Sequence, residues 1–156
     1  MIITPTSLTI NQLFGSNNEQ YIIPTYQRRY SWHERQIWEL IDDIGLIEGS
    51  DTHLLGSIVC LAGHHTAGLN KLELVDGQQR LTTVTILLEC IRQRLDAMGE
   101  KDEAAEVARL LQAKPLGGQS VRKVSLDSID AAEFDRLVAN DLQQEFQNKQ
   151  LELAFD

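Results

Sequence analysis

The chain has 156 residues, of which 42% are hydrophobic and 24% charged, as is ordinary for one globular domain. These values exclude a wholly disordered chain, a collagen-like chain and a small disulfide-stapled protein. The net charge is −9, and residues 1–95 carry 7 basic and 10 acidic side chains, against 7 and 13 in residues 96–156. So acidic a chain does not coat nucleic acid with its whole surface, but a local basic site in its first part remains open.

The sequence also suggests a cellular location. No apolar run approaches the roughly 20 residues that a membrane helix needs. The N-terminus lacks the basic residues and the small-residue cleavage site of a signal peptide. Cys60 and Cys90 lie in apolar stretches, far from any Cys-x-x-Cys spacing, and we expect them to be reduced core residues. We therefore expect a cytoplasmic protein that has no membrane partner.

Periodicity predicts both helices and strands. Helices are expected over 7–14, over about 14 residues that follow an N-cap at Ser31 and include Ile37 and Ile47, and over 77–98, 102–113, 130–139 and 141–155. Strands are expected over 21–23, 54–61, 72–75 and 121–126. The strands 54–61 and 72–75 can form a hairpin around the turn-rich loop 63–70. Ser31 and Glu34 have the form of a capping box before the second helix. The predicted class is α/β (α+β), with a small mixed sheet followed by a mainly helical part.

A strand is expected to turn into the longest helix at Asp76. Asp76 and Gln79 can form a capping box and Gly77 permits a close turn, so a structural explanation suffices for these three. It does not suffice for Arg80, because a cation in the first turn opposes the positive end of the helix dipole. Either a carboxylate or a bound anion would balance it. Free amides, a glycine and an arginine suit phosphate, and Thr82–Thr83 add hydroxyls for phosphate or a hydrated metal.

A second segment, 23–32, interleaves aromatic and basic residues. Pro24 disfavours helix before it, so the segment is expected to be extended, which places on one face Tyr26, Arg28, Tyr30 and Trp32. Such a face suits stacking on bases and contact with phosphates. Alternatively, the aromatic rings anchor the segment on the core. We favour the anchor for Tyr30 and Trp32, and a polar site for Gln27 and Arg28.

Three ordered motifs resemble one family. They are Ile-Pro-x-Tyr-Gln-Arg-x-Tyr-x-Trp at 23–32, Leu-Gly-Ser-Ile-Val at 55–59, and Val-Asp-Gly-Gln-Gln-Arg-Leu-Thr-Thr at 75–83. Together they resemble the N-terminal domain of GmrSD-type restriction endonucleases (the domain-of-unknown-function 262 family) over residues 7–98. That family resembles the ParB and sulfiredoxin fold, whose Gly-x-x-Arg turn binds nucleotide phosphates. The resemblance implies a ParB-like nucleotide- or DNA-sensing domain over 1–100 and a truncated helical extension over 101–156.

The resemblance also implies an activity and its residues. Members belong to bacterial defence systems that cut modified foreign DNA, and their N-terminal domain is linked to nucleoside triphosphate hydrolysis with a divalent cation such as Mg²⁺. We expect catalytic roles for Asp76, Gln78 and Arg80, with Asp76 as the metal ligand. The residues expected to bind the nucleotide are Gly77, Gln78, Gln79, Arg80, Thr82, Thr83, Tyr26, Gln27 and Arg28.

Cleavage in this family is ascribed to a separate C-terminal domain with a His-Asn-His metal site, which this sequence does not supply. We expect a fragment, or one half of a split system, that does not cut DNA alone and needs such a nuclease as its partner. The leading hypothesis is the nucleotide-binding regulatory domain of a modification-dependent restriction system that acts on modified foreign DNA. The alternatives are a non-catalytic DNA-binding module that senses modification, or an inactive fragment.

Overall fold

The fold is known from a computed structural model, which describes residues 5–127, 130–139 and 145–156. Its helices are α1 (Ile10–Gly15), α2 (Glu34–Gly45), α3 (Gln78–Met98), α4 (Lys101–Leu110), α5 (Ala131–Val138) and α6 (Lys149–Phe155). Its strands are β1 (Glu19–Ile23), β2 (Val59–Thr66), β3 (Leu69–Asp76), β4 (Gln112–Ala113), β5 (Val121–Arg122) and β6 (Val124–Leu126). This combination confirms the α+β class.

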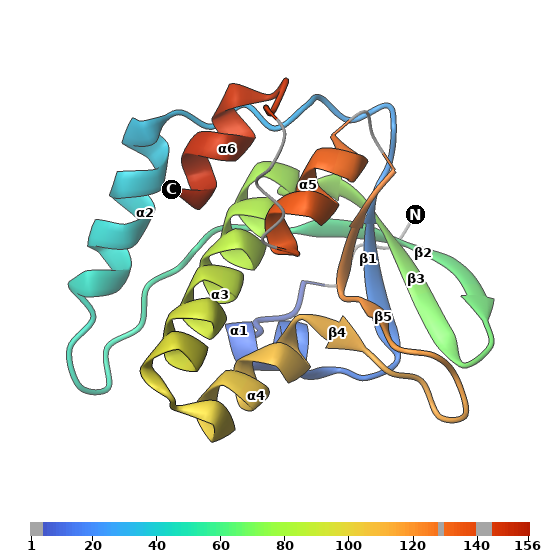
Figure 1. Ribbon diagram of the computed structural model, residues 1–156. Coiled ribbons are helices and arrows are strands. Elements are labelled where there is room, and N and C mark those ends of the chain that lie inside the picture. Colours follow the sequence, from blue (N-terminus) through green and yellow to red (C-terminus); the bar gives the residue numbers. More distant parts are fainter. Residues whose placement is uncertain (1–4, 128–129, 140–144) are drawn as a thin grey trace.

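The main sheet is mixed and has the strand order β2-β3-β1-β6. Strand β1 runs parallel to both β3 and β6, whereas β2 and β3 form an antiparallel hairpin. Strands β4 and β5 form a separate antiparallel pair. Figure 1 shows the β2–β3 hairpin projecting at the right as one edge of the sheet, with α2, α3 and α6 to the left of the sheet. Because β6 pairs with β1, both ends of the sequence contribute to one sheet.

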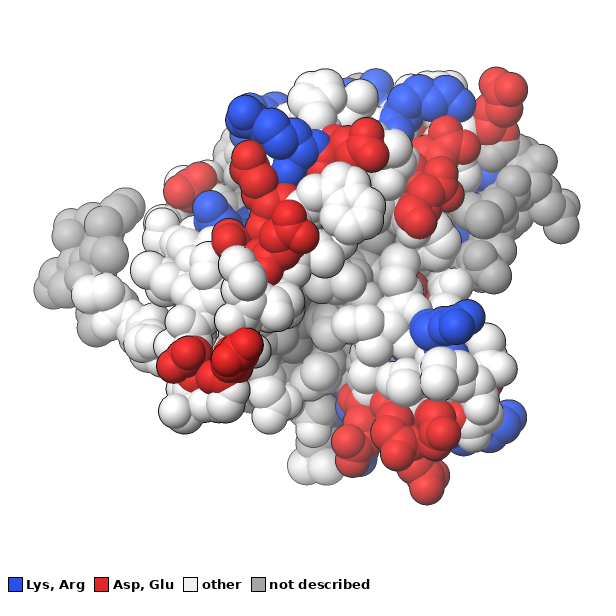
Figure 2. All heavy atoms as spheres, turned by 90° about the vertical axis from the view of Figure 1, so that its left-hand side faces the viewer, with Lys and Arg blue, Asp and Glu red and all other residues white. Residues whose placement is uncertain are grey.

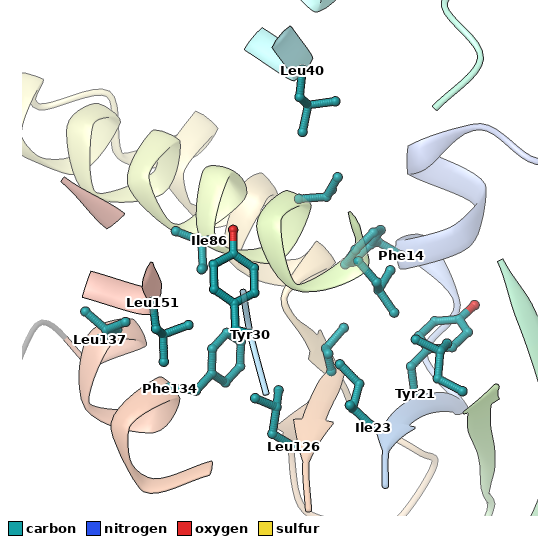
Figure 3. Packing of buried hydrophobic residues seen from close by; sticks show 14 of the residues in the cluster. Phe14, Tyr21, Ile23, Tyr30, Leu40, Ile86, Leu126, Phe134, Leu137 and Leu151 are labelled. Atoms are coloured by element: carbon teal, nitrogen blue, oxygen red, sulfur yellow. The ribbon is translucent and has the colours of Figure 1, made fainter. Parts of the chain in front are cut away.

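The core lies between the sheet and the helices and includes side chains from the whole length of the chain. Phe14, Leu81 and Leu151 are all almost completely buried and belong to one cluster. Figure 3 shows Tyr30 within this cluster, near Ile86 and Phe134. The division into a domain over 1–100 and an extension over 101–156 stays a prediction, as does the likeness to ParB and sulfiredoxin.

The predicted hairpin is confirmed, but the strand expected over 54–61 is wrong. Residues 51–58 form no regular structure, and β2 begins only at Val59 and continues to Thr66. Gly56 has φ +107°, which a strand does not accommodate, and Leu54 is 85% exposed. The turn of the hairpin lies at Ala67–Gly68, so most of the predicted loop 63–70 belongs to the strands.

Two other predicted boundaries also differ. The capping box of Ser31 and Glu34 is wrong, because α2 begins after His33 and the side-chain oxygen of Gln36 accepts from the His33 amide at 3.0 Å. The helix expected over 102–113 ends at Leu110 and gives way to β4. The helix expected over 141–155 falls partly on residues 140–144, outside the described residues, and its described part is helical only from Lys149 to Phe155.

The charge is unevenly distributed over the surface. Figure 2 shows the side of the molecule on which α2 lies, where acidic side chains form several groups that are interspersed with basic side chains and uncharged surface. Helix α2 also leaves Trp38 and Ile44 exposed by 55% and 37%. Such a face is unsuited to following a DNA backbone, which attracts clustered Lys and Arg. In the described ranges no helix is both long and apolar enough to cross a membrane.

Candidate functional site: a polar pocket with two arginines

The N-terminus of α3 is shaped by Gly77. Its φ is +90°, and a side chain there would place Cβ 3.1 Å from the carbonyl oxygen of Ser57, so both conformation and space favour glycine. The first hydrogen bond of the helix runs from the amide of Leu81 to the carbonyl oxygen of Gly77 at 2.9 Å. The amides of residues 78–80 therefore precede the helical ladder, and they have no hydrogen-bond partner among the described residues, which leaves them available to an anion.

The predicted capping box at this helix start is wrong. Gly77 is the N-cap and makes no side-chain capping hydrogen bond, and neither Asp76 nor Gln79 caps the helix within the described part of the chain. The side chain of Gln79 is buried and bonds instead to the segment before α2, and that of Asp76 is exposed at the end of β3. The helix start thus leaves its amides without the side-chain partner that the sequence suggested.

A pocket of about 390 Å³ opens at this point, and we call it the polar pocket. It is lined by Arg28, Trp32, Ser57, Asp76, Gly77, Gln78, Gln79 and Arg80. The motifs at 23–32 and 75–83, which are far apart in the sequence, therefore meet here. The pocket also includes Ser57 from the motif at 55–59, which the sequence did not single out as a site residue.

Arg80 is held across the backbone of the 51–58 segment. Its Nη1 donates to the carbonyl oxygen of Ser57 at 3.0 Å. Its guanidinium carbon lies only 2.8 Å from where a Cβ of Gly56 would be, so the missing side chain of Gly56 makes room for the guanidinium. The Leu-Gly-Ser motif therefore positions Arg80, a role that no periodicity or charge pattern could have revealed.

The charged groups of the polar pocket have no charged partners in the described part of the chain. Arg28 and Arg80 form no ion pair with a described carboxylate, and Asp76 forms no ion pair or side-chain hydrogen bond with a described residue. Two uncompensated arginines in a chain of net charge −9 form a local positive site. Such a site beside free helix amides suits an anion with several charged oxygens.

The pocket offers one carboxylate for a metal. Among the residues that the structure describes, no three His, Cys, Asp or Glu side chains gather to hold a metal ion. Mg²⁺, however, is commonly bound by one or two carboxylates together with the phosphates of a substrate. The exposed Asp76 fits that requirement, and its role as a metal ligand stays a prediction.

Behind the polar pocket lies a hydrogen-bonded network that we call the buried junction. It consists of Arg29, Tyr30, Gln79, Thr83, Asp130 and Asn148. The Gln79 side chain accepts from the amide of Ser31 at 2.7 Å and donates to the carbonyl oxygen of Arg29 at 3.1 Å. The Thr83 hydroxyl donates to the carbonyl oxygen of Gln79 at 2.8 Å and shares a 2.7 Å hydrogen bond with the hydroxyl of Tyr30. These contacts join α3 to the motif at 23–32.

Asp130 connects the same junction to the last part of the chain. Its carboxylate is fully buried and pairs with the Arg29 guanidinium at 2.6 Å. It also accepts from the amide of Tyr30 at 3.1 Å and from the side chain of Asn148 at 2.8 Å. Sequence reasoning missed Asp130 and Asn148, because Arg29 and Asp130 are 101 positions apart and no local pattern relates them.

The expectation that four side chains of segment 23–32 share one face is wrong. The backbone turns after Pro24, because the amide of Gln27 donates to the carbonyl oxygen of Pro24 at 3.1 Å. Tyr26 is 65% exposed and bonds to Glu73, whereas Tyr30 is only 5% exposed. The anchoring role predicted for Tyr30 is confirmed, and burial raises the pKa of its hydroxyl to about 12.

Several residues expected to bind the nucleotide do not line the polar pocket. Tyr26 bonds to Glu73 at the surface, and the Gln27 side chain donates to the carbonyl oxygen of Val75 at 3.0 Å, which ties the segment to β3. Thr82 and Thr83 are buried within α3. Of the predicted set, the pocket brings together Arg28 and the run Asp76–Arg80, and the side chain of Gln79 is turned into the junction.

Comparison with known families identifies the chain as a whole. Its sequence matches the family model described as GmrSD restriction endonuclease, N-terminal domain, over residues 10–155. The chain belongs to this family. Membership in the GmrSD N-terminal domain family connects the chain to a restriction system, in which DNA is the substrate, and the match includes nearly all of residues 101–156. No curated protein matches the sequence.

Proposed function

We propose that this chain is the nucleoside triphosphate-binding regulatory domain of a modification-dependent DNA restriction system. The observation that carries the proposal is the meeting of Arg28 and Arg80 at the free amides of α3, without a paired carboxylate in the described part of the chain. A triphosphate supplies the negatively charged partner that neither arginine has among the described residues. It also supplies oxygens for the amides of residues 78–80.

Each residue of the polar pocket has a distinct role in this proposal. Arg80, held against Ser57, binds phosphate oxygens through its remaining guanidinium N–H groups, and Arg28 approaches from the segment before α2. Asp76 would hold Mg²⁺, which when bound neutralises phosphate charge and polarises a phosphoryl oxygen. Asp76 and Gln78 are the two side chains that can orient a water beside the terminal phosphate.

In this proposal nucleotide binding is separate from DNA cleavage. A nuclease with a His-Asn-His site, in another domain or another protein, would cut the modified DNA. The chain described here would control that nuclease through its nucleotide state. This division follows the family, in which the matched part is named as the N-terminal domain of the endonuclease.

The proposal is tested by thermal unfolding of the chain with Mg²⁺ and each nucleoside triphosphate, for the wild type and Arg80→Ala. A ligand at about 100 times its Kd adds about 2.7 kcal/mol to the free energy of unfolding. We expect Arg80→Ala to abolish this gain. The control is Arg35→Ala, because Arg35 is an exposed arginine of α2 outside the pocket. An equal gain in Arg80→Ala and wild type would refute the proposal.

A second variant moves Arg80 without removing its charge. In Gly56→Ala the new Cβ would lie 2.8 Å from the Arg80 guanidinium carbon, so the guanidinium must shift. We expect triphosphate affinity to fall about tenfold, because misplaced binding groups lose much of their contribution. Gly49→Ala is the matched control, because Gly49 also has positive φ (+58°) and open space around it. Equal affinities in the two variants would show that the position of Arg80 is unimportant.

A further inference from the structure

A second pocket adjoins the polar pocket and is mainly apolar. It has a volume of about 450 Å³ and is formed by α1, the 51–58 segment and α3. Its walls include Leu13, Leu55, Ile58, Leu81 and Val84. We call it the apolar pocket. Its volume is within the range of sites that hold small organic ligands, and its lining has the composition typical of them.

Arg80 lines both pockets and is the one described residue that they share in their linings. Its guanidinium crosses the 51–58 segment at Gly56, which lines the apolar pocket, and bonds to Ser57, which lines the polar pocket. Leu81 and Val84 follow Arg80 on α3 and point into the apolar side. The arrangement therefore places a cation at the boundary between a polar site and an apolar site.

We infer that the apolar pocket holds the base and sugar of a nucleoside triphosphate whose phosphates lie in the polar pocket. The inference rests on the proposed function and deepens it, because it makes the ligand a whole nucleotide rather than any polyphosphate. A nucleotide has an apolar ring face at one end and a polyanion at the other. Arg80 lies where these two parts would join, and Asp51, Thr52 and His53 at the pocket edge offer hydrogen bonds to the base or sugar.

The alternative is that the protein binds only the phosphates of the ligand, and that the base and sugar make no contact with the apolar pocket. In that case inorganic tripolyphosphate would bind as tightly as a nucleotide, because the polar pocket would supply all of the affinity. Burial of a ring against aliphatic side chains adds affinity that tripolyphosphate does not receive. The ratio of the two dissociation constants therefore measures what the apolar pocket contributes.

The experiment measures Kd by titration calorimetry, with Mg²⁺ present, for tripolyphosphate and for ATP, GTP, CTP and UTP. We expect at least one nucleotide to bind the wild type ten or more times as tightly as tripolyphosphate, about the factor that apolar contacts of this size supply. In Leu55→Ala we expect that advantage to fall about tenfold, with tripolyphosphate affinity unchanged. Leu8→Ala provides a second variant, because Leu8 lines the pocket but is 54% exposed and contributes little to folding.

The matched control is Leu116→Ala, since Leu116 is fully exposed and lines neither pocket. Equal affinity for tripolyphosphate and all four nucleotides would overturn the inference and leave the proposed function intact. A nucleotide advantage that survives in both Leu55→Ala and Leu8→Ala would also overturn it. If the wild type binds neither tripolyphosphate nor any nucleotide, the proposed function fails, and the inference fails with it.

Discussion

The polar pocket and the buried junction both contain residues of the motifs at 23–32 and 75–83, and neighbouring residues of these motifs are divided between them. Arg28 lines the polar pocket without a described ion-pair partner, whereas Arg29 pairs with the buried Asp130 at 2.6 Å. Gln78 lies at the pocket, whereas the side chain of Gln79 is 6% exposed and bonds to backbone groups of residues 29 and 31. Consecutive motif residues thus alternate between side chains that line the polar pocket and side chains that hold the buried junction together.

This difference separates binding from folding. The polar pocket has exposed charges whose removal leaves no buried group unsatisfied, so its variants should change affinity and not stability. The junction has buried polar groups that satisfy one another, and loss of one leaves its partners without hydrogen bonds. The amide of Ser31 bonds to Gln79 of the junction, and Ser31 directly precedes Trp32, which lines the pocket, so damage to the junction should also disturb the pocket.

The largest expected effect comes from Asp130→Ala. It removes the fully buried carboxylate that holds Arg29, the amide of Tyr30 and the side chain of Asn148. The Arg29 side chain is 45% exposed and stays hydrated, but the Tyr30 amide and the Asn148 side chain each lose a buried acceptor. Each such loss costs about 1–3 kcal/mol, so we expect the free energy of unfolding to fall by about 2–5 kcal/mol. Urea unfolding followed by circular dichroism measures the loss. Asp135→Ala is the control, because the Asp135 side chain is 58% exposed in its ion pair, and it should cost less than about 1 kcal/mol. Similar losses in both variants would refute the distinction.

The adjacent glutamines give a closer comparison with a smaller effect. Gln79→Ala leaves the amide of Ser31 and the carbonyl oxygen of Arg29 without their partners, and we expect it to lower the free energy of unfolding by about 2 kcal/mol. Gln78→Ala should change it by less than about 0.5 kcal/mol. The same urea experiment measures both. Equal stability of the two variants would mean that the junction does not depend on Gln79.

Much of the fold could be predicted because its signals are local. The long helix α3, the hairpin and the short α5 follow from periodicity and turn residues close together in the chain. The irregular 51–58 segment was missed, because its aliphatic run Leu54–Leu61 looks like a strand. The positive φ of Gly56 excludes a strand there, and the Arg80 guanidinium occupies the space that a side chain at this position would need; neither feature is visible in a local pattern.

The candidate site could be predicted only in part, for the same reason. The helix N-terminus and the misplaced charge of Arg80 indicate an anion site from the sequence alone. Gln79 is turned away from that site because it bonds to the backbone of residues 29–31, and Ser31, one of its partners, is 48 positions earlier in the sequence. Asp130 and Asn148 approach from still farther along the chain. Long-range hydrogen bonds therefore decide which motif residues are structural.

The smallest expected effect on stability comes from the hydroxyl of Tyr30. The pH dependence of this effect tests whether the hydroxyl belongs to the buried junction. Burial raises its pKa from 10.0 to about 12, and the hydrogen bond with Thr83 opposes part of this rise. The unfolded chain therefore loses this proton at a lower pH than the folded chain does. Stability from this group is complete below pH 10 and declines as the pH rises through about 12. Tyr21 and Cys60, whose pKa values are also raised, add to the same decline.

Tyr30→Phe isolates the contribution of this one hydroxyl, because the background from Tyr21 and Cys60 is common to both proteins. At neutral pH the variant should be about 1 kcal/mol less stable, the value of one buried hydrogen bond. The difference should narrow as the pH rises from about 10 to about 12, because only the wild type titrates at this position. Urea unfolding at a series of pH values measures the narrowing. A difference that stays constant over this range would place the Tyr30 hydroxyl outside the buried junction.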